Sequence, residues 1–372
     1  MVTIGTQTCS ETRNSHSCQT ANITPSSQQQ TSSASREINT AGGVSIRGTF
    51  KQKDYDEEVI DILEKSRRPN TRRLYNSYIH KWELFCVKCK INPYNVEVKY
   101  VLRFLLNLRN EHACGYSALN TARSALSAVV CLKDEHKNLG THPDICRFLM
   151  GIFQETPAKP KYQVIWDASS VLNVLKSWSP GKYLSLKKLT CKVVMLFMLV
   201  TGQRVQTLSL LNLENMIIQD HQIIFTVTEK LKQFRPGHNS IQIVLKRYRE
   251  EPKLCVLNYL GLYLKRVKFL RTSNYLFVSL NKPHQAVTSD TISRWVKYVL
   301  QQSGIDTKVF GSHSVRSASS SAAKNMGVSI DQIMKNCGWS NAKTFAHWYD
   351  KPIVSLKQLH SYGHKVLNSH RK

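Results

Sequence analysis

Residues 311–318 read Gly-Ser-His-Ser-Val-Arg-Ser-Ala, which places His313 three positions before Arg316. On a helix, two residues at this spacing project from the same face. An imidazole beside a guanidinium suits a phosphoryl group, because Arg makes two parallel charge-assisted bonds and His exchanges a proton near neutral pH. This spacing is common, and alone it indicates surface chemistry without function, so the surrounding sequence must decide.

A second arginine follows the most apolar run of the chain, residues 193–200 (VVMLFMLV). The run is shorter than the ~18 residues of a membrane span and predicts a buried helix that ends or bends at Gly202. An unpaired charge emerging from such surroundings is costly. Since Arg204 has no Asp or Glu near it in the sequence between positions 181 and 214, an external phosphate is at least as good a partner as an internal ion pair.

Two aromatic positions near the end of the chain complete the pattern. Trp339 lies in the phrase GWS, at the end of a predicted helix, and Tyr349 follows ten positions later. Phe345 and Trp348 are expected to be core residues. Tyr349 stands close to Pro352 at a helix end, where its side chain can be presented outward.

The charge of the chain favours a polyanionic partner, either nucleic acid or an acidic membrane surface. Lys and Arg number 52 against 25 Asp and Glu, a formal net charge of +27. Residues 1–50 contribute only +1 of it, so the charge lies on the folded part. We therefore expect a basic body that binds double-stranded DNA, with no membrane span and no secretory signal.

The ten cysteines are expected to be reduced core residues, as in a protein that is not secreted. Cys86 and Cys89 form one CxxC pair, but a second ligand pair at finger-like spacing is missing, and the pair falls within an amphipathic run. No metal site is expected.

Composition and periodicity divide the chain into four parts. Residues 1–50 are rich in Ser, Thr, Gln and Asn and are expected to be disordered. Residues 51–154 show helical periodicity in four or five segments, and residues 155–164 contain two prolines typical of a linker. Residues 165–372 should be mainly helical with one hairpin, strands 222–227 and 240–245. The expected fold class is mainly α with a small antiparallel β-sheet (α+β).

Five cations are candidates for contacts to DNA, although solvated surface charge is the alternative for each. Three lie on polar faces of the predicted N-terminal helices, and two lie in the basic turn of the hairpin. They are Arg72, Arg73, Arg123, Lys230 and Arg235.

Taken in order, the first arginine, a hairpin lysine, HxxR, GW and the tyrosine resemble the tyrosine recombinases of the phage integrase family. The similarity is closer to recombinases of eukaryotic mobile elements, the Cryptons and DIRS-like retroelements. It rests on the phrases HSVRSA (313–318), GVSI (327–330), GWS (338–340) and TF (344–345), and it spans roughly residues 70–360. Its five-part order is very specific.

The resemblance implies a role for each matching residue. Tyr349 would attack the scissile phosphate and form a 3′-phosphotyrosyl bond. Arg204 and Arg316 would hold the non-bridging oxygens and stabilise the transition state. His313 would bond the phosphate and assist proton transfer, and the Trp339 indole N–H would donate to a phosphate oxygen.

The hairpin lysine would protonate the departing 5′-oxygen. Lys232 fits best, and Lys230, one strand period away, is the alternative. No cofactor is implied: the cations take the place of metal ions, and the tyrosyl ester conserves the energy of the broken bond, so ATP is not needed. One position departs from the family, since many members have Glu three residues after the first arginine. Here that residue is Thr207, preceded by Gln206, and a hydroxyl or amide would orient Arg204 instead.

The resemblance also implies an N-terminal helical core-binding domain, a C-terminal catalytic domain with DNA between them, a homotetramer on two DNA sites, and a nuclear location. Residues 355–360 would dock on a neighbouring subunit. Two alternatives remain. One is a domesticated DNA-binding protein that has lost catalysis, which the intact set of six residues disfavours. The other is a type IB topoisomerase-like enzyme, which the HSxRSA and GWS phrases disfavour.

Overall fold

The chain forms two compact units in a computed structural model, residues 1–159 and 160–372. The division falls within the stretch predicted as a linker, residues 155–164. Apart from the side chains of Thr344, His347 and Trp348, the structure describes residues 43–133, 138–157, 161–229, 231, 234, 237, 240–339 and 341–353.

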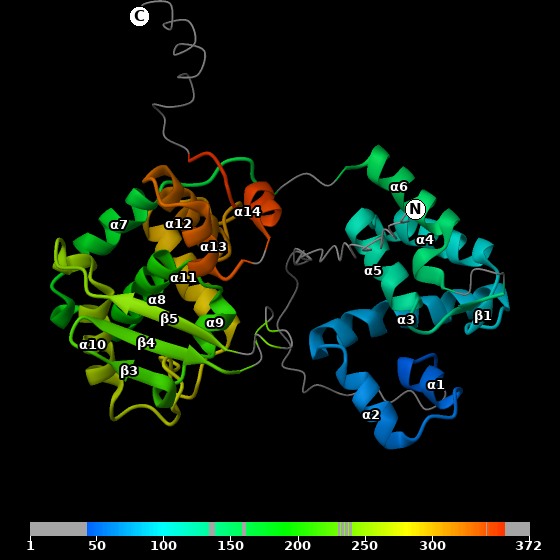
Figure 1. The fold of residues 1–372 in the computed structure, drawn as a ribbon, viewed down its shortest axis with the longest axis horizontal. Helices are drawn as coiled ribbons and strands as arrows, with labels where there is room; N and C mark the ends of the chain where they lie inside the picture. Colours follow the sequence, from blue (N-terminus) through cyan, green and yellow to red (C-terminus); the bar gives the residue numbers. More distant parts are fainter. Residues whose placement is uncertain are drawn as a thin grey trace, which may run out of the picture. The chain divides into compact units, whose positions relative to one another are not determined.

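The first unit is a helical bundle (Figure 1). Its core surrounds Trp82, which is fully buried, packs against the rings of Phe85 and Phe104, and donates its indole N–H to the Pro93 carbonyl at 2.9 Å. The helices are α1 (Ile46–Lys51), α2 (Glu57–Lys65), α3 (Pro69–Cys89), α4 (Val98–His112), α5 (Tyr116–Leu126) and α6 (Pro143–Glu155), with a short parallel pair, β1 (Asn95–Val96) and β2 (Cys131–Leu132).

Helix α1 corrects the expectation that residues 1–50 are a disordered tail. Ile46 is buried, and Arg47 forms ion pairs with three carboxylates of α2, those of Glu57, Asp61 and Glu64. Composition did not indicate this helix because it is short and its few apolar residues, Ile46 and the partly buried Phe50, stand within otherwise polar sequence. The rest of the expected tail, residues 1–42, lies outside the described residues.

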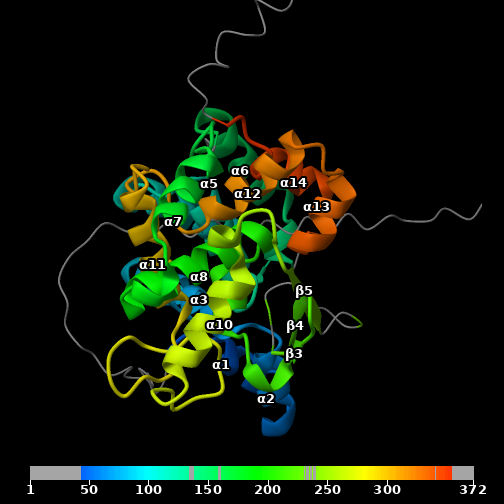
Figure 2. The same ribbon diagram turned by 90° about the vertical axis from the view of Figure 1, so that its left-hand side faces the viewer.

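The second unit is built around α8, which is buried on nearly all sides and is surrounded by α10, α11 and α12 (Figures 1 and 2). Its apolar run explains this position, since a helix that is apolar all round must be covered. The helices are α7 (Ala168–Ser177), α8 (Leu186–Thr201), α9 (Val205–Ser209), α10 (Val256–Val267), α11 (Ser289–Gln302), α12 (Ser314–Asn325), α13 (Ile330–Cys337) and α14 (Ala342–Trp348).

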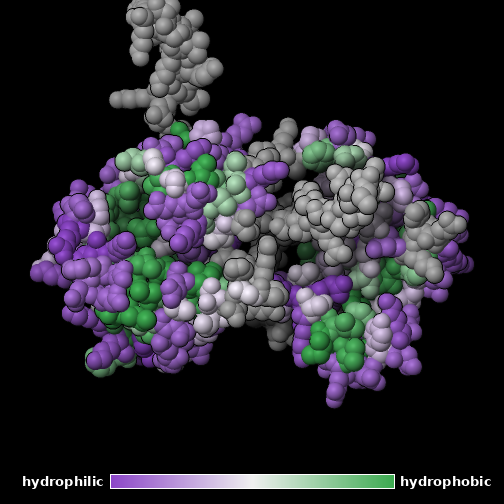
Figure 3. Space-filling view, in the orientation of Figure 1, coloured by the Kyte–Doolittle hydropathy of each residue, from purple (hydrophilic) through white to green (hydrophobic). Residues whose placement is uncertain are grey.

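Three antiparallel strands form one sheet in the order β3 (Met216–Ile218), β4 (Gln222–Val227) and β5 (Ile241–Lys246). Phe225, in the middle of β4, is opposite Met216 and Ile243 and is fully buried against α8. The outer side of the sheet is partly apolar (Figure 3). The hairpin prediction thus agrees with β4 and β5 to within one residue, whereas the three-residue β3 was missed because it is too short to show alternation.

Helix α8, the apolar run, has 16 residues. No helix within the part of the chain that the structure describes is long and apolar enough to cross a membrane.

Candidate active site

Gly202 ends α8, as predicted, in a left-handed conformation with φ of 59°. A Cβ atom at this position would lie 2.4 Å from the Cys337 Sγ, so a side chain does not fit without displacement. The turn after Gly202 brings Arg204 to the N-terminus of α9, where it is half-buried. Glycine is therefore required both by the backbone conformation and by the close approach of α13.

Arg316, in the first turn of α12, is the central cation of the site and is only 1% exposed. Its Nη1 donates to the Gly202 carbonyl at 2.5 Å, and its Nη2 donates to the Cys337 carbonyl at 2.6 Å. The guanidinium also lies 4.1 Å from the centre of the Trp339 ring. Arg316 therefore ties three elements together: the turn after α8, the end of α13 and α12 itself.

The charges around Arg316 favour an anionic ligand. Burial, together with the positive charge of Arg204, lowers the pKa of Arg316 to about 10. The guanidinium still remains charged at neutral pH. No carboxylate forms an ion pair with Arg316 within the described residues. Two neighbouring cations held in this way gain from a phosphate between them.

Tyr349 ends α14 and is 4% exposed, which corrects the expectation that its side chain points outward. Its ring lies 4.6 Å from the ring of Trp339, and its hydroxyl is 2.9 Å from the Nε2 of His313. The aromatic contact and this hydrogen bond keep the ring against the protein. The candidate nucleophile is thus already in contact with the candidate proton-transfer group, which is itself exposed.

Within the described part of the chain, two buried N–H groups of the site have no hydrogen-bond partner: the Nε of Arg316 and the indole nitrogen of Trp339. A buried donor without an acceptor costs roughly 1–3 kcal/mol. Both belong to the cluster that surrounds the Tyr349 ring. Donors of this kind suit an acceptor-rich ligand, and the oxygens of a phosphate provide such acceptors.

Five of the six residues predicted to be catalytic are thus brought together at the ends of helices. The pairwise contacts above join His313, Arg316, Trp339 and Tyr349. Arg204 is close enough for its charge to lower the pKa of Arg316. Lys232 and its alternative Lys230 lie outside the described residues, as does the hairpin residue Arg235 and the segment 355–360. Of Thr207 the structure shows that its backbone N–H donates to the Arg204 carbonyl.

The cations predicted to contact DNA in the first unit differ in environment. Arg72 and Arg73 begin α3, where Arg73 is exposed and Arg72 is half-buried. Arg123 donates to the Gly140 carbonyl at 2.9 Å, so part of its hydrogen-bonding capacity is used within the protein. A contact of Arg123 to DNA stays a prediction, and a structural role now competes with it.

Prediction from sequence missed two serines of α12. The hydroxyls of Ser317 and Ser321 both donate to the backbone carbonyl of Tyr349. The available signal was the run of small polar residues after Arg316, in which these two positions share a helix face.

The cysteines do not indicate a metal site. Cys86 is buried in α3, and burial raises the pKa of its thiol to about 12, which disfavours the thiolate that a metal needs. Among the described residues, no group of three or more His, Cys, Asp and Glu is placed to hold an ion.

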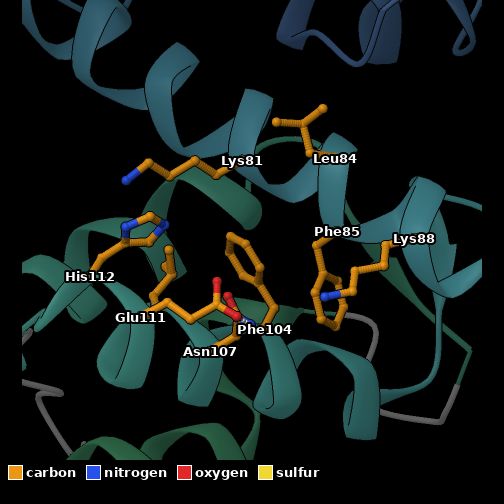
Figure 4. Close-up of a pocket in the computed structure, with 9 residues that line it drawn as sticks. Lys81, Leu84, Phe85, Lys88, Phe104, Asn107, Glu111 and His112 are labelled. Atoms are coloured by element: carbon orange, nitrogen blue, oxygen red, sulfur yellow. Dashed lines mark hydrogen bonds between the residues drawn. The ribbon is translucent and has the colours of Figure 1, made fainter.

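A pocket of about 190 Å³ lies in the first unit between α3 and α4 (Figure 4). Phe85 and Phe104 contribute apolar surface to it, and Lys81, Lys88 and His112 contribute basic groups. None of the residues predicted from sequence to be functional lines it.

Comparison with known proteins identifies a matching family and a matching fold. Residues 170–352 match the phage integrase family. That stretch contains every catalytic residue predicted above, and the second unit has the fold of a tyrosine recombinase catalytic domain. The predicted fold class is thereby confirmed.

Two solved structures illustrate the similarity of fold. XerH site-specific recombinase, bound to palindromic difH substrate in a post-cleavage complex, is 12% identical, with a TM-score of 0.56 over 85% of this chain and 84% of that chain. The Tn1549 transposon integrase, in complex with transposon right end DNA, is 14% identical, with a TM-score of 0.55 over 87% and 99%. No curated protein matches the chain in sequence.

Proposed function

We propose that this protein is a DNA tyrosine recombinase of a mobile element, which cuts and rejoins DNA strands through a 3′-phosphotyrosyl bond at Tyr349. The observation that carries the proposal is the hydroxyl of Tyr349, 2.9 Å from the His313 imidazole. Beside it lie the buried Arg316 and two buried N–H donors, one of them on Arg316, that have no acceptor among the described residues. A nucleophile, a proton-transfer group and a set of phosphate-binding donors are what phosphoryl transfer to a side chain requires.

The reaction follows from these positions. The Tyr349 oxygen forms a bond to phosphorus, and the bond to the 5′-oxygen breaks. His313 takes the phenolic proton on its Nε2, which lies next to the hydroxyl. Arg204, Arg316 and the Trp339 N–H stabilise the charge on the non-bridging oxygens. Lys232 protonates the departing 5′-oxygen, with Lys230 as the alternative. Attack by a 5′-hydroxyl of another strand reverses the step and rejoins DNA.

The setting of the reaction is part of the proposal. A net charge of +27 favours a DNA partner, and XerH and the Tn1549 integrase are both described in complexes with DNA. We propose that the chain acts as a homotetramer on two DNA sites in the nucleus, as part of a Crypton or DIRS-like element. No metal ion and no nucleotide cofactor take part.

Two other functions compete with recombination. A type IB topoisomerase-like enzyme would use a similar tyrosine but would relax DNA without a second site. A domesticated DNA-binding protein would keep the fold and lose the chemistry. The assembled contacts between Tyr349, His313 and Arg316 support a working site over the second of these.

A plasmid assay separates the three possibilities. Supercoiled plasmids that carry one or two copies of the DNA flanking the coding sequence are incubated with the purified protein, and the products are resolved on gels. Recombination requires two copies and yields deletion or inversion products. Relaxation of a plasmid without such a copy would favour a topoisomerase. Binding with neither product would favour a domesticated protein.

A further inference from the structure

Helix α12 contains three buried serines within five residues, and their hydroxyls differ in their hydrogen-bond partners. Ser317, Ser320 and Ser321 are each at most 1% exposed. Ser320 bonds carbonyls of its own helix, those of Arg316 and Ser317. The other two reach across to α14: the Ser317 and Ser321 hydroxyls donate to the Tyr349 carbonyl at 2.9 and 3.0 Å.

These two hydrogen bonds to one carbonyl oxygen fix the backbone at the candidate nucleophile. A carbonyl oxygen has two lone pairs, and here both are occupied. The Ser321 hydroxyl also accepts the backbone N–H of Lys351 at 3.1 Å, so it bridges two residues of the same segment. On the other side, the Tyr349 N–H donates to the Phe345 carbonyl.

The N-cap residue of the helix that holds this backbone is His313, the partner of the Tyr349 hydroxyl. One rigid element therefore controls both ends of the tyrosine, its carbonyl through the two serines and its hydroxyl through the imidazole. An ion pair between Lys324 of α12 and Asp350 adds a contact at the surface.

We propose that Ser317 and Ser321 are positioning residues for the attack on phosphorus: they hold the Tyr349 backbone so that its hydroxyl meets His313 and the phosphate. The inference rests on the proposed function of Tyr349. Because reacting atoms must meet at about 3–3.5 Å, a displacement of about 1 Å slows such a step about 100-fold. The two serines touch neither the phosphate nor the reacting atoms, so their loss should change the rate of attack and leave DNA binding unchanged.

The test compares four variants of the full chain: Ser317→Ala, Ser321→Ala, both together, and Ser320→Ala as the control with equal burial and only helix-internal bonds. Each is incubated with a nicked suicide DNA substrate, and the dissociation constant and the first-order rate of covalent attachment are measured separately. The double variant should attach about 100-fold more slowly at unchanged affinity, and each single variant about 10-fold. Ser320→Ala should stay within about 2-fold of the wild type. Amide hydrogen exchange at Lys351 should accelerate in Ser321→Ala and in the double variant, and not in the control.

Several outcomes would overturn the proposal. The proposal is overturned if the double variant attaches to DNA as fast as Ser320→Ala. It is also overturned if the double variant loses affinity for DNA by the same factor as it loses rate of attachment. If the double variant does not fold, the single variants decide by the same criteria. If the wild type forms no adduct, the proposed function fails. The exchange experiment still shows whether the serines hold the backbone of this segment, and unchanged protection of the Lys351 amide in Ser321→Ala would reject that part of the proposal.

Discussion

The indole nitrogen of Trp339 has a rare position for a polar atom, because it is buried next to a buried guanidinium and finds no acceptor among the described residues. In Arg316 only the Nε is a buried donor without an acceptor among the described residues, since its two Nη atoms each donate to a backbone carbonyl. A guanidinium has five N–H groups, so donors remain for a ligand. Buried donors without acceptors do not add to stability, and under the proposed function they serve to bind the transition state.

Replacement of Trp339 by Phe tests this interpretation at a single atom. The ring stays over Arg316, and only the N–H is lost. Covalent attachment to DNA should slow by ~10²-fold, as expected for one lost transition-state donor. The free energy of unfolding should not fall, because the substitution removes a buried donor that has no partner. A rate within about 2-fold of the wild type, or a marked loss of stability, would contradict the assignment.

Gly202 gives a second prediction at the residue scale. Gly202→Ala places a methyl group 2.4 Å from the Cys337 Sγ and forces an L-residue into the left-handed region. The free energy of unfolding should fall by at least about 2 kcal/mol. The control is Gly261→Ala in the interior of α10, where an added Cβ would meet no atom within 4 Å apart from the backbone of its own helix. There the change should be neutral or stabilising by about 0.5–1 kcal/mol. Equal effects at the two glycines would show that the turn is not tightly constrained.

At the scale of elements, sequence predicted what long patterns encode. The apolar run predicted the buried helix α8, and residues 222–227 were predicted as the strand that is β4. Each of these patterns extends over several residues, so a single exception does not hide it.

Contacts between distant elements could not be predicted. The Tyr349 side chain is held by the ring of Trp339, which follows α13, and by the imidazole of His313 at the start of α12. Helix α1 is joined to α2 by ion pairs between Arg47 and carboxylates of α2. The serines of α12 looked like ordinary small residues because their partner is a backbone carbonyl 28 or more positions away. A pattern along the chain contains no information about such a partner.

The candidates for the general acid, Lys232 and Lys230, stand in the sequence between β4 and β5. If Lys232 protonates the 5′-oxygen, Lys232→Ala should cleave slowly, because an unprotonated alkoxide is a poor leaving group. A substrate with a bridging 5′-sulfur, which leaves without a proton, should restore its rate. Cleavage is measured with both substrates for the Lys232 and Lys230 variants.

Arg316→Ala is the control for this experiment, since sulfur cannot replace lost charge stabilisation, and the rate should stay ~10²–10³ below the wild type. Rescue of Lys230→Ala, with Lys232→Ala near the wild type on both substrates, would assign the role to Lys230. If neither is rescued, His313 becomes the candidate acid.

For the whole molecule, the excess of 52 basic over 25 acidic residues predicts strong dependence of DNA affinity on salt. With about ten phosphates contacted, log K against log[salt] should have a slope near −9. Arg73→Ala should make this slope less steep by about one, because Arg73 is an exposed cation at the start of α3. Arg123→Ala should change it less, since Arg123 bonds the Gly140 carbonyl. A slope near zero, or activity that EDTA abolishes and Mg²⁺ restores, would contradict a metal-free enzyme that binds DNA through its basic surface.

Under the proposed function, Tyr349 forms the covalent bond to DNA. The most direct measurement traps the adduct with a nicked suicide substrate, digests the protein and identifies the modified residue by mass spectrometry. We expect one DNA-linked peptide, attached through Tyr349, and no adduct with Tyr349→Phe, whose affinity for DNA should be nearly unchanged. An adduct that persists in Tyr349→Phe, or that maps to Tyr362, would contradict the account.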